Sequence, residues 1–250
     1  MSLLQVKNIV KRFGNLVAVS DVSMTLEPGE LRAVIGPNGA GKTTFFNTIS
    51  GLLVPSAGRI IFDGEDVTGL APARRVWRGI ARTFQITEVF PELTVRENLR
   101  IAVESASGFR LRFWQSAQES EEVGARVADL LQMSGLAQKA DRLVGELAHG
   151  DQRANEIMMA LALRPRLLLL DEPTAGMGDQ ETYAITQLIR KLHRDQKLTI
   201  VLIEHDMRVV FHLADRIMVL AEGKMLAEGT PQEIAANEAV QTAYLGKAAA

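Results

Sequence analysis

Long, predominantly apolar segments stand out in the hydrophobic pattern of this chain. Residues 167–170 are consecutive leucines, and residues 198–203 read Leu-Thr-Ile-Val-Leu-Ile. Such runs are typical of strands that are buried on both faces of a parallel sheet. Residues 179–196 separate the two runs and are long enough for the helix that a parallel crossover needs. Residues 31–35 predict a further strand, so the pattern indicates an α/β fold.

Shorter segments that end at turn residues predict additional strands around this core. A terminal hairpin is predicted from residues 217–220 and 224–227, which flank Glu222-Gly223. The other predicted strands are 3–13 and 17–26, joined at Gly14-Asn15, then 59–62, closed by Asp63-Gly64, and 80–84.

The middle of the chain has a different pattern. Between about residues 88 and 164, helical spacing replaces β-branched runs, as in 116–133, where Val123, Val127 and Leu130 repeat near a helical period. We therefore predict a single domain over residues 1–250. Its core, about 1–87 and 165–250, is interrupted by a helical subdomain of about 88–164.

A phosphate-binding loop is predicted where the strand at 31–35 ends. The segment fits G-x-x-x-x-G-K-[ST] and stands between a strand and a helix, whereas an ordinary glycine-rich turn need satisfy neither condition. Its backbone N–H groups can converge on phosphate, Lys42 supplies a positive charge, and the Thr43 hydroxyl can bind Mg²⁺. The residues predicted to bind nucleotide are Gly36, Pro37, Asn38, Gly39, Ala40, Gly41, Lys42, Thr43 and Thr44.

Two carboxylates follow the leucine run directly. Asp171 is placed to hold Mg²⁺ directly or through water, as the acidic partner of the loop threonine. Glu172 points elsewhere and could orient or deprotonate an attacking water. The alternative, a solvated turn after a strand, loses weight because the phosphate loop is present in the same chain.

Composition narrows the class of protein further. A hydrophobic fraction of 47% and a charged fraction of 23% are typical of a soluble globular chain, and the net charge of -2 argues against binding to nucleic acid. The absence of cysteine excludes disulfides. We see no signal-peptide layout at the N-terminus and no apolar run near the ~20 residues that span a bilayer. Any role at a membrane is therefore expected to depend on partner proteins.

Further features complete a pattern when they are taken together. Gln85 follows the 80–84 strand, His205 follows the 198–203 strand, residues 147–153 open a helix, and Phe13 ends the first strand. In this order they closely resemble the Q-loop, switch histidine, signature sequence and adenine-stacking aromatic of the ATPase subunit of an ABC transporter. The resemblance covers essentially the whole chain. It implies a P-loop ABC ATPase cassette with an antiparallel β subdomain and an inserted helical subdomain.

The resemblance also implies roles for the residues. ATP and Mg²⁺ would be the cofactors, with Mg²⁺ held by Thr43, Gln85 and Asp171. Glu172 would position water, His205 would steady the γ-phosphate, and Lys42 would neutralise the phosphates. Two ATPase subunits, identical or different, would clamp ATP head to tail, and their closure would move membrane permeases. The chain would lie at the cytoplasmic face of the membrane, with a periplasmic or extracellular binding protein as an indirect partner.

The signature region departs from the family pattern of Leu-Ser-Gly-Gly-Gln. Ala148, His149 and Asp151 replace the serine, the first glycine and the glutamine, so the serine hydroxyl is lost. Gly150 and the helix N-terminus remain, and we expect them to bind anion through backbone N–H groups. Residues 175–178 also lack the aspartate that is common in this loop.

With these departures the chain resembles the ATPases for uptake of branched-chain amino acids. The likeness is carried by the signature region, residues 172–177 and the ending at 229–246. The segment 109–122, with Arg110, Arg112 and Trp114, resembles an insertion in the larger ATPase of that system; the alternative is a solvated surface helix. Urea and short-chain amide importers share these features. The remaining alternatives are a lipopolysaccharide-export ATPase, a soluble ABC-type ATPase and a nucleotide-binding regulator without turnover.

Overall fold

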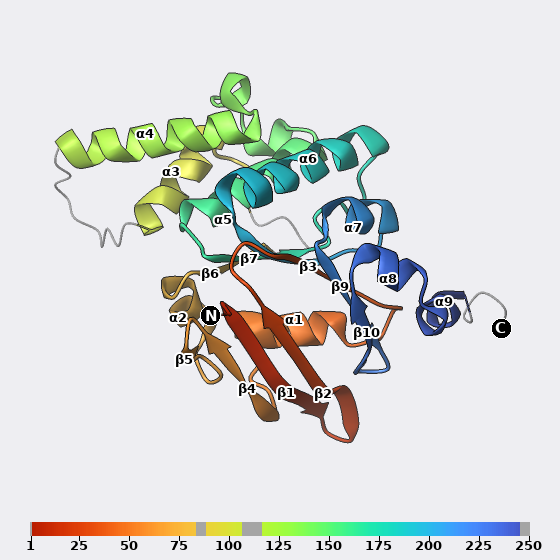
Figure 1. Cartoon of the computed structure of the whole chain (residues 1–250). Helices are drawn as coiled ribbons and strands as arrows, with labels where there is room; N and C mark the ends of the chain where they lie inside the picture. The colour runs from red at the N-terminus through yellow and green to blue at the C-terminus, as the bar shows by residue number, and fades with distance from the viewer. Residues whose placement is uncertain (1, 84–88, 107–116, 246–250) are drawn as a thin grey trace.

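The computed structural model describes residues 2–83, 89–106 and 117–245 (Figure 1). Its larger sheet has six strands in the order β10-β9-β3-β8-β7-β6. The strands from β9 to β6 run parallel to one another, and β10 pairs with β9 in the antiparallel direction. The bounds are β3 Leu31–Ile35, β6 Ile80–Arg82, β7 Leu167–Asp171, β8 Thr199–Ile203, β9 Arg216–Ala221 and β10 Lys224–Gly229.

The smaller sheet is antiparallel, with its four strands in the order β2-β1-β4-β5. Apolar residues of β1 and β2, such as Val6, Ile9 and Val22, are buried against the helix that follows the phosphate loop. This helix, α1, lies between the two sheets (Figure 1). The bounds are β1 Leu4–Phe13, β2 Leu16–Leu26, β4 Ala57–Phe62, β5 Glu65–Asp66 and α1 Lys42–Ser50.

Period-two alternation explains how the larger sheet is covered on both faces. Leu167 and Leu169 pack toward α1 and the smaller sheet, whereas Leu168 and Leu170 pack in a second cluster with the other helices. A strand buried on both faces needs apolar residues at every position, which is why these leucines form a continuous run.

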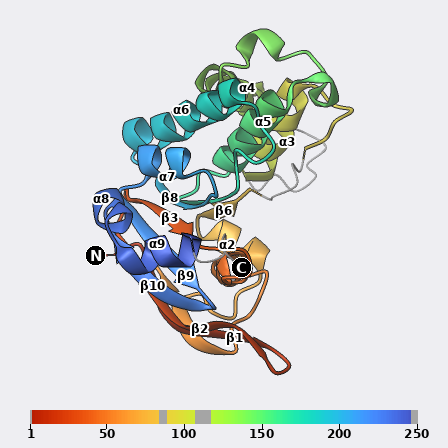
Figure 2. The ribbon, with the colours of Figure 1, turned by 90° about the vertical axis from the view of Figure 1, so that its right-hand side faces the viewer.

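Three of the remaining helices lie together. The helices α3, α4 and α5 gather at the end of the molecule away from β1 and β2, as both views show (Figures 1 and 2). The bounds are α2 Pro72–Trp77, α3 Val95–Ala106, α4 Ala117–Ser134, α5 His149–Ala162, α6 Asp179–Gln196, α7 Met207–Leu213, α8 Pro231–Ala235 and α9 Glu238–Leu245.

The sequence predicted most of these elements. The predicted α/β core with an antiparallel sheet and a helical region is present, and α6 has the bounds that were predicted. The strand predicted at 80–84 corresponds to β6, which begins at Ile80 and is described as far as Arg82, and the predicted end at Phe84 lies outside the described residues. The division into a core and a helical subdomain stays a prediction.

The parallel strands bring the predicted site residues to one edge. The loops after β3, β7 and β8 all leave from the carboxyl ends of their strands, and ligands bind at this edge in open α/β sheets. These loops carry the phosphate-binding segment, Glu172 and His205. Gln85 lies outside the described residues.

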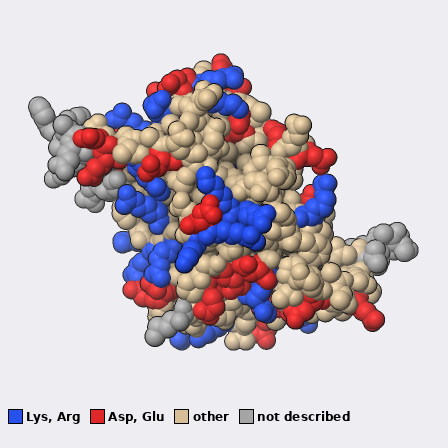
Figure 3. Space-filling view, turned by 45° about the horizontal axis from the view of Figure 1, so that its top comes forward, with Lys and Arg blue, Asp and Glu red and all other residues tan. Residues whose placement is uncertain are grey.

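The length and composition of the helices show whether one of them could cross a membrane. Among the described helices, none is both long and apolar enough to cross a bilayer. On the face shown in Figure 3, basic and acidic side chains lie next to one another in several places, and uncharged residues cover much of the remaining surface.

Candidate functional site

The phosphate loop depends on glycine at positions where another residue would not fit. Gly36 has φ +152°, and a Cβ atom there would lie 2.1 Å from the carbonyl oxygen of Leu220. At Gly41, with φ +94°, a Cβ atom would lie 2.4 Å from the carbonyl oxygen of Ala18. The loop is thus pressed against β9 and β2, and its backbone can turn into α1 only because these side chains are missing.

Lys42 begins α1 and turns its side chain back over the loop. Its Nζ donates hydrogen bonds to the carbonyl oxygens of Gly36, at 2.7 Å, and Pro37, at 3.1 Å. Burial lowers the pKa of Lys42, whereas the nearby carboxylates of Glu172 and Asp171 act in the opposite direction. The ammonium group is therefore held at the base of the loop, where phosphate oxygens can take the place of the carbonyls.

A pocket of about 580 Å³ opens above this loop. Its lining includes residues 38–44 of the loop, Phe13 at the end of β1, and Glu172 and His205 from the loops after β7 and β8. Its volume falls in the range of small-molecule and cofactor sites, about 300–1,000 Å³. Seven of the nine predicted loop residues, the aromatic residue and the two polar residues thus line one cavity, whereas Gly36 and Pro37 are not among its lining residues.

Phe13 lies at the rim of this pocket. The residue is 47% exposed, and the Lys11 ammonium group lies 5.2 Å from the centroid of its ring. An exposed aromatic face at the edge of a polar pocket offers a stacking surface for a planar base. Its role in stacking on adenine stays a prediction.

Glu172 and His205 form a direct pair across the pocket. His205 Nε2 lies 2.7 Å from Glu172 Oε1, and each side chain comes from a different strand end. The Glu172 backbone has φ +46°, which is uncommon for a residue with a long side chain. Strained backbone of this kind is found at functional sites when the surrounding structure holds it in place.

Glu204 helps to hold the turn after β7 that carries Glu172, and no motif in the sequence predicted this role. Its carboxylate is 3% exposed and accepts hydrogen bonds from the Thr174 N–H at 2.9 Å and the Thr174 hydroxyl at 2.6 Å. Its other oxygen accepts the His205 N–H at 3.0 Å. The loops that carry Glu172 and His205 are therefore linked by one buried side chain. The only sequence signal was an acidic residue directly after a buried strand.

Asp171 is buried at the end of β7. Its Oδ2 forms an ion pair with Arg82 at 2.8 Å, and Arg82 also donates to the Ser50 hydroxyl at 2.9 Å. Burial raises the pKa of Asp171, and the arginine counteracts this rise. The Arg82 partner was not predicted from the sequence.

The donor set fits Mg²⁺ in its chemistry. Thr43 contributes a hydroxyl to the pocket lining, whereas Asp171 is not among the lining residues and offers a buried carboxylate that is paired with Arg82. Such hard oxygen ligands suit Mg²⁺, which also takes ligands from nucleotide phosphates. The third predicted ligand, Gln85, is outside the described residues.

The start of α5 has an anion partner within this chain. The Gly150 N–H donates to Oε1 of Glu181, a residue of α6, at 2.9 Å. A carboxylate at a helix N-terminus is favourable because the first N–H groups of a helix have no partner inside it. Ala148, the N-cap residue, has no side-chain group that could provide this bond. The arrangement shows that this N–H binds an oxyanion, but Gly150 is not among the described residues that line the nucleotide-sized pocket.

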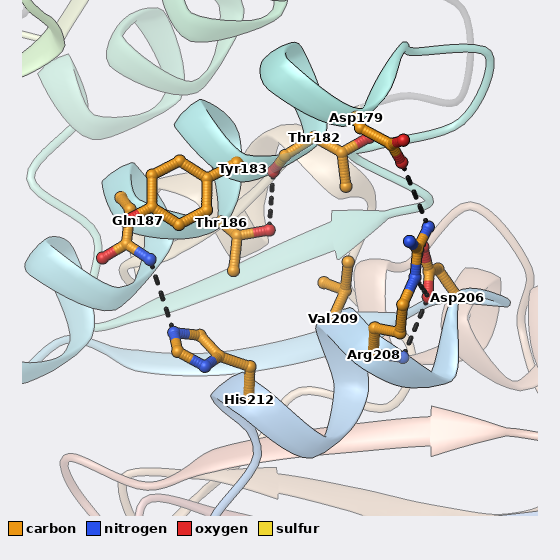
Figure 4. Close-up of a pocket in the computed structure, with 9 residues that line it drawn as sticks. All are labelled: Asp179, Thr182, Tyr183, Thr186, Gln187, Asp206, Arg208, Val209 and His212. Atoms are coloured by element: carbon orange, nitrogen blue, oxygen red, sulfur yellow. Dashed lines mark hydrogen bonds and ion pairs between the residues drawn. The ribbon is translucent and has the colours of Figure 1, made fainter.

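A smaller pocket, of about 250 Å³, lies between α6 and α7 (Figure 4). Arg208 points between two carboxylates at its edge, lying 2.8 Å from Asp206 and 3.4 Å from Asp179. These ion pairs connect the start of α7, just after His205, with the start of α6. The exposed Tyr183 ring lines another part of this pocket.

Comparison with known proteins agrees with this geometry. The family model for the ABC transporter matches residues 19–175, and the model for the branched-chain amino acid ATP-binding cassette transporter matches residues 224–250. The chain is 41% identical to the high-affinity branched-chain amino acid transport ATP-binding protein BraF of Pseudomonas aeruginosa, and 42% identical to LivG, which has the same description, of Escherichia coli. Each comparison covers 98% of both proteins.

A solved structure gives the same result. The ADP conformation of an ATP-binding cassette from an ABC transporter superposes with a TM-score of 0.86 at 29% identity, covering 98% of this chain and 99% of the other. The fold and the phosphate pocket define a nucleotide-binding cassette. The chain belongs to the ABC transporter family, as one of its ATP-binding proteins, and within the family it is similar over its full length to those named for branched-chain amino acid transport. The predicted family is therefore confirmed.

Proposed function

We propose that this chain hydrolyses ATP to drive an importer of branched-chain amino acids or related small amides. The observation that carries the activity is that Lys42 of the phosphate loop and the Glu172–His205 pair line one pocket. The match of the C-terminal residues 224–250 to the branched-chain amino acid model and the two full-length relatives support the substrate class.

The residues have distinct tasks in the proposed reaction. N–H groups of the phosphate loop and the Lys42 ammonium group bind and orient the β- and γ-phosphates. Glu172 orients the attacking water, and His205 fixes the Glu172 carboxylate through the 2.7 Å contact while facing the γ-phosphate. Thr43, Asp171 and Gln85 would hold Mg²⁺, which neutralises developing charge on the phosphates when it is bound. No covalent intermediate on the protein is needed.

The proposed assembly has two ATPase subunits arranged head to tail on the cytoplasmic face of the membrane. Each pocket would be closed by the signature helix of the other subunit, where Gly150 would exchange the Glu181 carboxylate for a phosphate oxygen. The second ATPase can be a copy of this chain or a different one. Permease subunits would carry the substrate, and a periplasmic or extracellular binding protein would deliver it.

The activity is tested with Glu172→Gln and Lys42→Ala. Glu172→Gln keeps the side-chain shape and removes the base, so ATP should still bind while turnover falls by roughly 10²–10⁴-fold. Lys42→Ala should abolish binding, because the phosphates lose their cation. The matched control is Glu222→Gln, another carboxylate of the pocket lining, which should keep turnover within about twofold. Parental turnover in Glu172→Gln would remove Glu172 from the mechanism.

The substrate class is tested in the assembled transporter. Membranes that contain this chain with its permeases should take up radiolabelled leucine in the presence of ATP and the binding protein, and Glu172→Gln should stop the uptake. Uptake of urea or a short-chain amide, with none of leucine, would assign the chain to the amide importers instead.

A further inference from the structure

A buried arginine connects the signature helix with the turn that carries Glu172. Arg153 lies on α5 and is 1% exposed. Its Nη2 donates to the carbonyl oxygen of Glu172 at 3.1 Å, and its Nε donates to the carbonyl oxygen of Pro173 at 3.2 Å. The guanidinium group thus binds consecutive carbonyls of the turn directly after β7.

A second buried charge fixes the arginine in this position. Arg153 Nη1 lies 2.6 Å from Glu156 Oε2, and Glu156 is itself only 4% exposed. A buried ion pair is weak evidence for a contribution to stability, because desolvation offsets the attraction between the charges. The ion pair is better explained by the orientation it gives to the guanidinium group, because the rigid planar fork of arginine fixes the direction of its hydrogen bonds to the turn.

The turn that Arg153 binds needs support from outside. Glu172 has φ +46°, a conformation that is unfavourable for a residue other than glycine and persists only when its surroundings enforce it. Glu204, from the core, holds the turn at Thr174. Arg153 holds the other end from the inserted helical region, and so the backbone on which the Glu172 carboxylate stands is fixed from both sides.

The position of Arg153 along α5 connects the start of this helix with the turn that carries Glu172. It lies one helical turn after His149 and Gly150, which begin the helix, and the Gly150 N–H donates to the Glu181 carboxylate. A rigid helix that shifts when its first turn binds phosphate must carry the guanidinium group with it. The carbonyls of Glu172 and Pro173 would follow, because the hydrogen bonds connect them to that group.

We propose that Arg153 is a positioning residue that sets the Glu172 carboxylate against the attacking water and couples its placement to the signature helix. Glu156 acts through Arg153 by fixing the guanidinium group. This inference rests on the proposed function, because it presumes that Glu172 positions water in ATP hydrolysis.

The experiment compares Arg153→Met, Arg153→Lys and Glu156→Gln. The methionine has a similar length and no donors, the lysine can reach one carbonyl but lacks the fork, and the glutamine removes the charge of the ion pair. Arg126→Met is the matched control, since Arg126 is a partly buried arginine of the same helical region that donates to the Leu161 carbonyl at 3.4 Å. Steady-state kinetics, ATP binding and thermal unfolding are measured for each variant.

A positioning role predicts a split between kcat and KM. Arg153→Met should lower kcat by about 10–100-fold, the size of effect that misplacing a reacting group by ~1 Å produces, with KM for ATP within about threefold. Arg153→Lys and Glu156→Gln should fall between Arg153→Met and the parent. The control should keep its parental kcat. A loss of ATP binding or of folding in all three variants, including the conservative ones, would make Arg153 merely structural and overturn the inference.

Combining substitutions tests whether Arg153 acts through Glu172. If it does, Arg153→Met should slow single-turnover hydrolysis by less than about threefold in the Glu172→Gln background, because residues that act as a unit are not additive. If Arg153→Met slowed hydrolysis in the Glu172→Gln background by the same factor as in the parent, the inference would be overturned. Parental kcat in Arg153→Met, with turnover lost in Glu172→Gln, would overturn it while the proposed function stands. Parental turnover in Glu172→Gln would instead refute the proposed function, and the inference with it.

Discussion

At the scale of single residues, the site depends on close approach of backbone to backbone around the phosphate loop. The loop packs against the carbonyl of Leu220 in β9 so closely that a Cβ atom at Gly36 has no space. Gly39, three residues on, has φ +79°, but an added Cβ atom there would meet no other atom within 4 Å. The two glycines therefore separate the effect of backbone conformation from that of a steric clash.

We expect Gly36→Ala to lower the free energy of unfolding by about 2–5 kcal/mol, since it adds a clash to an unfavourable φ. Gly39→Ala should cost about 1–2 kcal/mol, because it introduces only the unfavourable φ. Urea unfolding of both variants measures the difference. Equal losses would mean that the loop moves away from β9 without a penalty.

Sequence patterns singled out the residues to which we assign direct chemical tasks, but not the residues that hold them in place. Lys42 and Glu172 each stand in a short motif of residues that are close together in the sequence, one in the phosphate loop and one directly after the leucine run. Glu204 and Arg153 bind the Glu172 turn only after strands and helices far apart in sequence have packed together. A buried polar residue looks like any other in the sequence until its partner is known, so tertiary contact is what the sequence analysis lacked.

At the scale of elements, α1 is closed at its C-terminus by a buried arginine of α2. Arg75 is 1% exposed and donates to the carbonyl oxygens of Thr48 and Ile49 at 2.6 Å each, and to that of Thr68 at 2.9 Å. The last carbonyls of a helix have no partner inside it, and a cation there also suits the helix dipole. Burial lowers the pKa of Arg75 to about 10.

We expect Arg75→Met to lower the free energy of unfolding by about 2–4 kcal/mol, because buried carbonyls lose charged donors. Arg74→Met, at an exposed neighbouring position, should change it by less than about 0.5 kcal/mol. Chemical denaturation of the two variants is the measurement. A small effect at Arg75 would show that water satisfies the end of α1.

The C-terminal helix α9 carries a tyrosine whose titration reports its packing. Burial raises the pKa of Tyr244 to about 12, although the Gly36 N–H acts in the opposite direction. Because the pKa is higher in the folded chain than in the unfolded one, the stabilising contribution is complete below about pH 10 and disappears as the pH rises toward 12. The chain has two tyrosines, so Tyr183→Phe leaves Tyr244 as the only phenol that absorbs on ionisation.

Absorbance titration of Tyr183→Phe should show a midpoint near pH 12, and the same variant cut before α9, which then lacks both tyrosines, should show no phenol titration. A midpoint near the ordinary value of about 10 would mean that α9 is detached in solution.

The hydrophobic pattern predicted buried strands and long helices better than short helices. The strands β7 and β8 were visible as continuous apolar runs, and α6 is a helix of 18 residues between them. The short helices α2 and α8 have too few turns to show a helical period. The start of α8 does carry a signal, since Thr230 and Glu233 form a capping box, a pattern that can be found in a sequence.

At the scale of the whole molecule, the helical region is where we expect the permease to dock. Phe90 lies just before α3 and is 48% exposed, yet its backbone is rigidly held. The Asn98 amide, which is fully buried, accepts the Phe90 N–H at 2.8 Å and donates to its carbonyl oxygen at 2.9 Å. An apolar side chain presented outward from a fixed backbone suits an interface whose partner is a helix with apolar residues.

The absence of cysteine from this chain makes the docking site testable with single-cysteine variants. Phe90→Cys should form a disulfide or a short cross-link with cysteines placed along the cytoplasmic loops of a permease. Val54→Cys is the control, because Val54 is similarly exposed, at 57%, but lies beside the antiparallel sheet, where Lys11 of β1 binds its carbonyl. The yield at position 90 should change with ATP if closure of the clamp moves the helical region against the permease. Cross-links from position 54 with none from position 90 would place the permease on the antiparallel sheet and contradict the assignment.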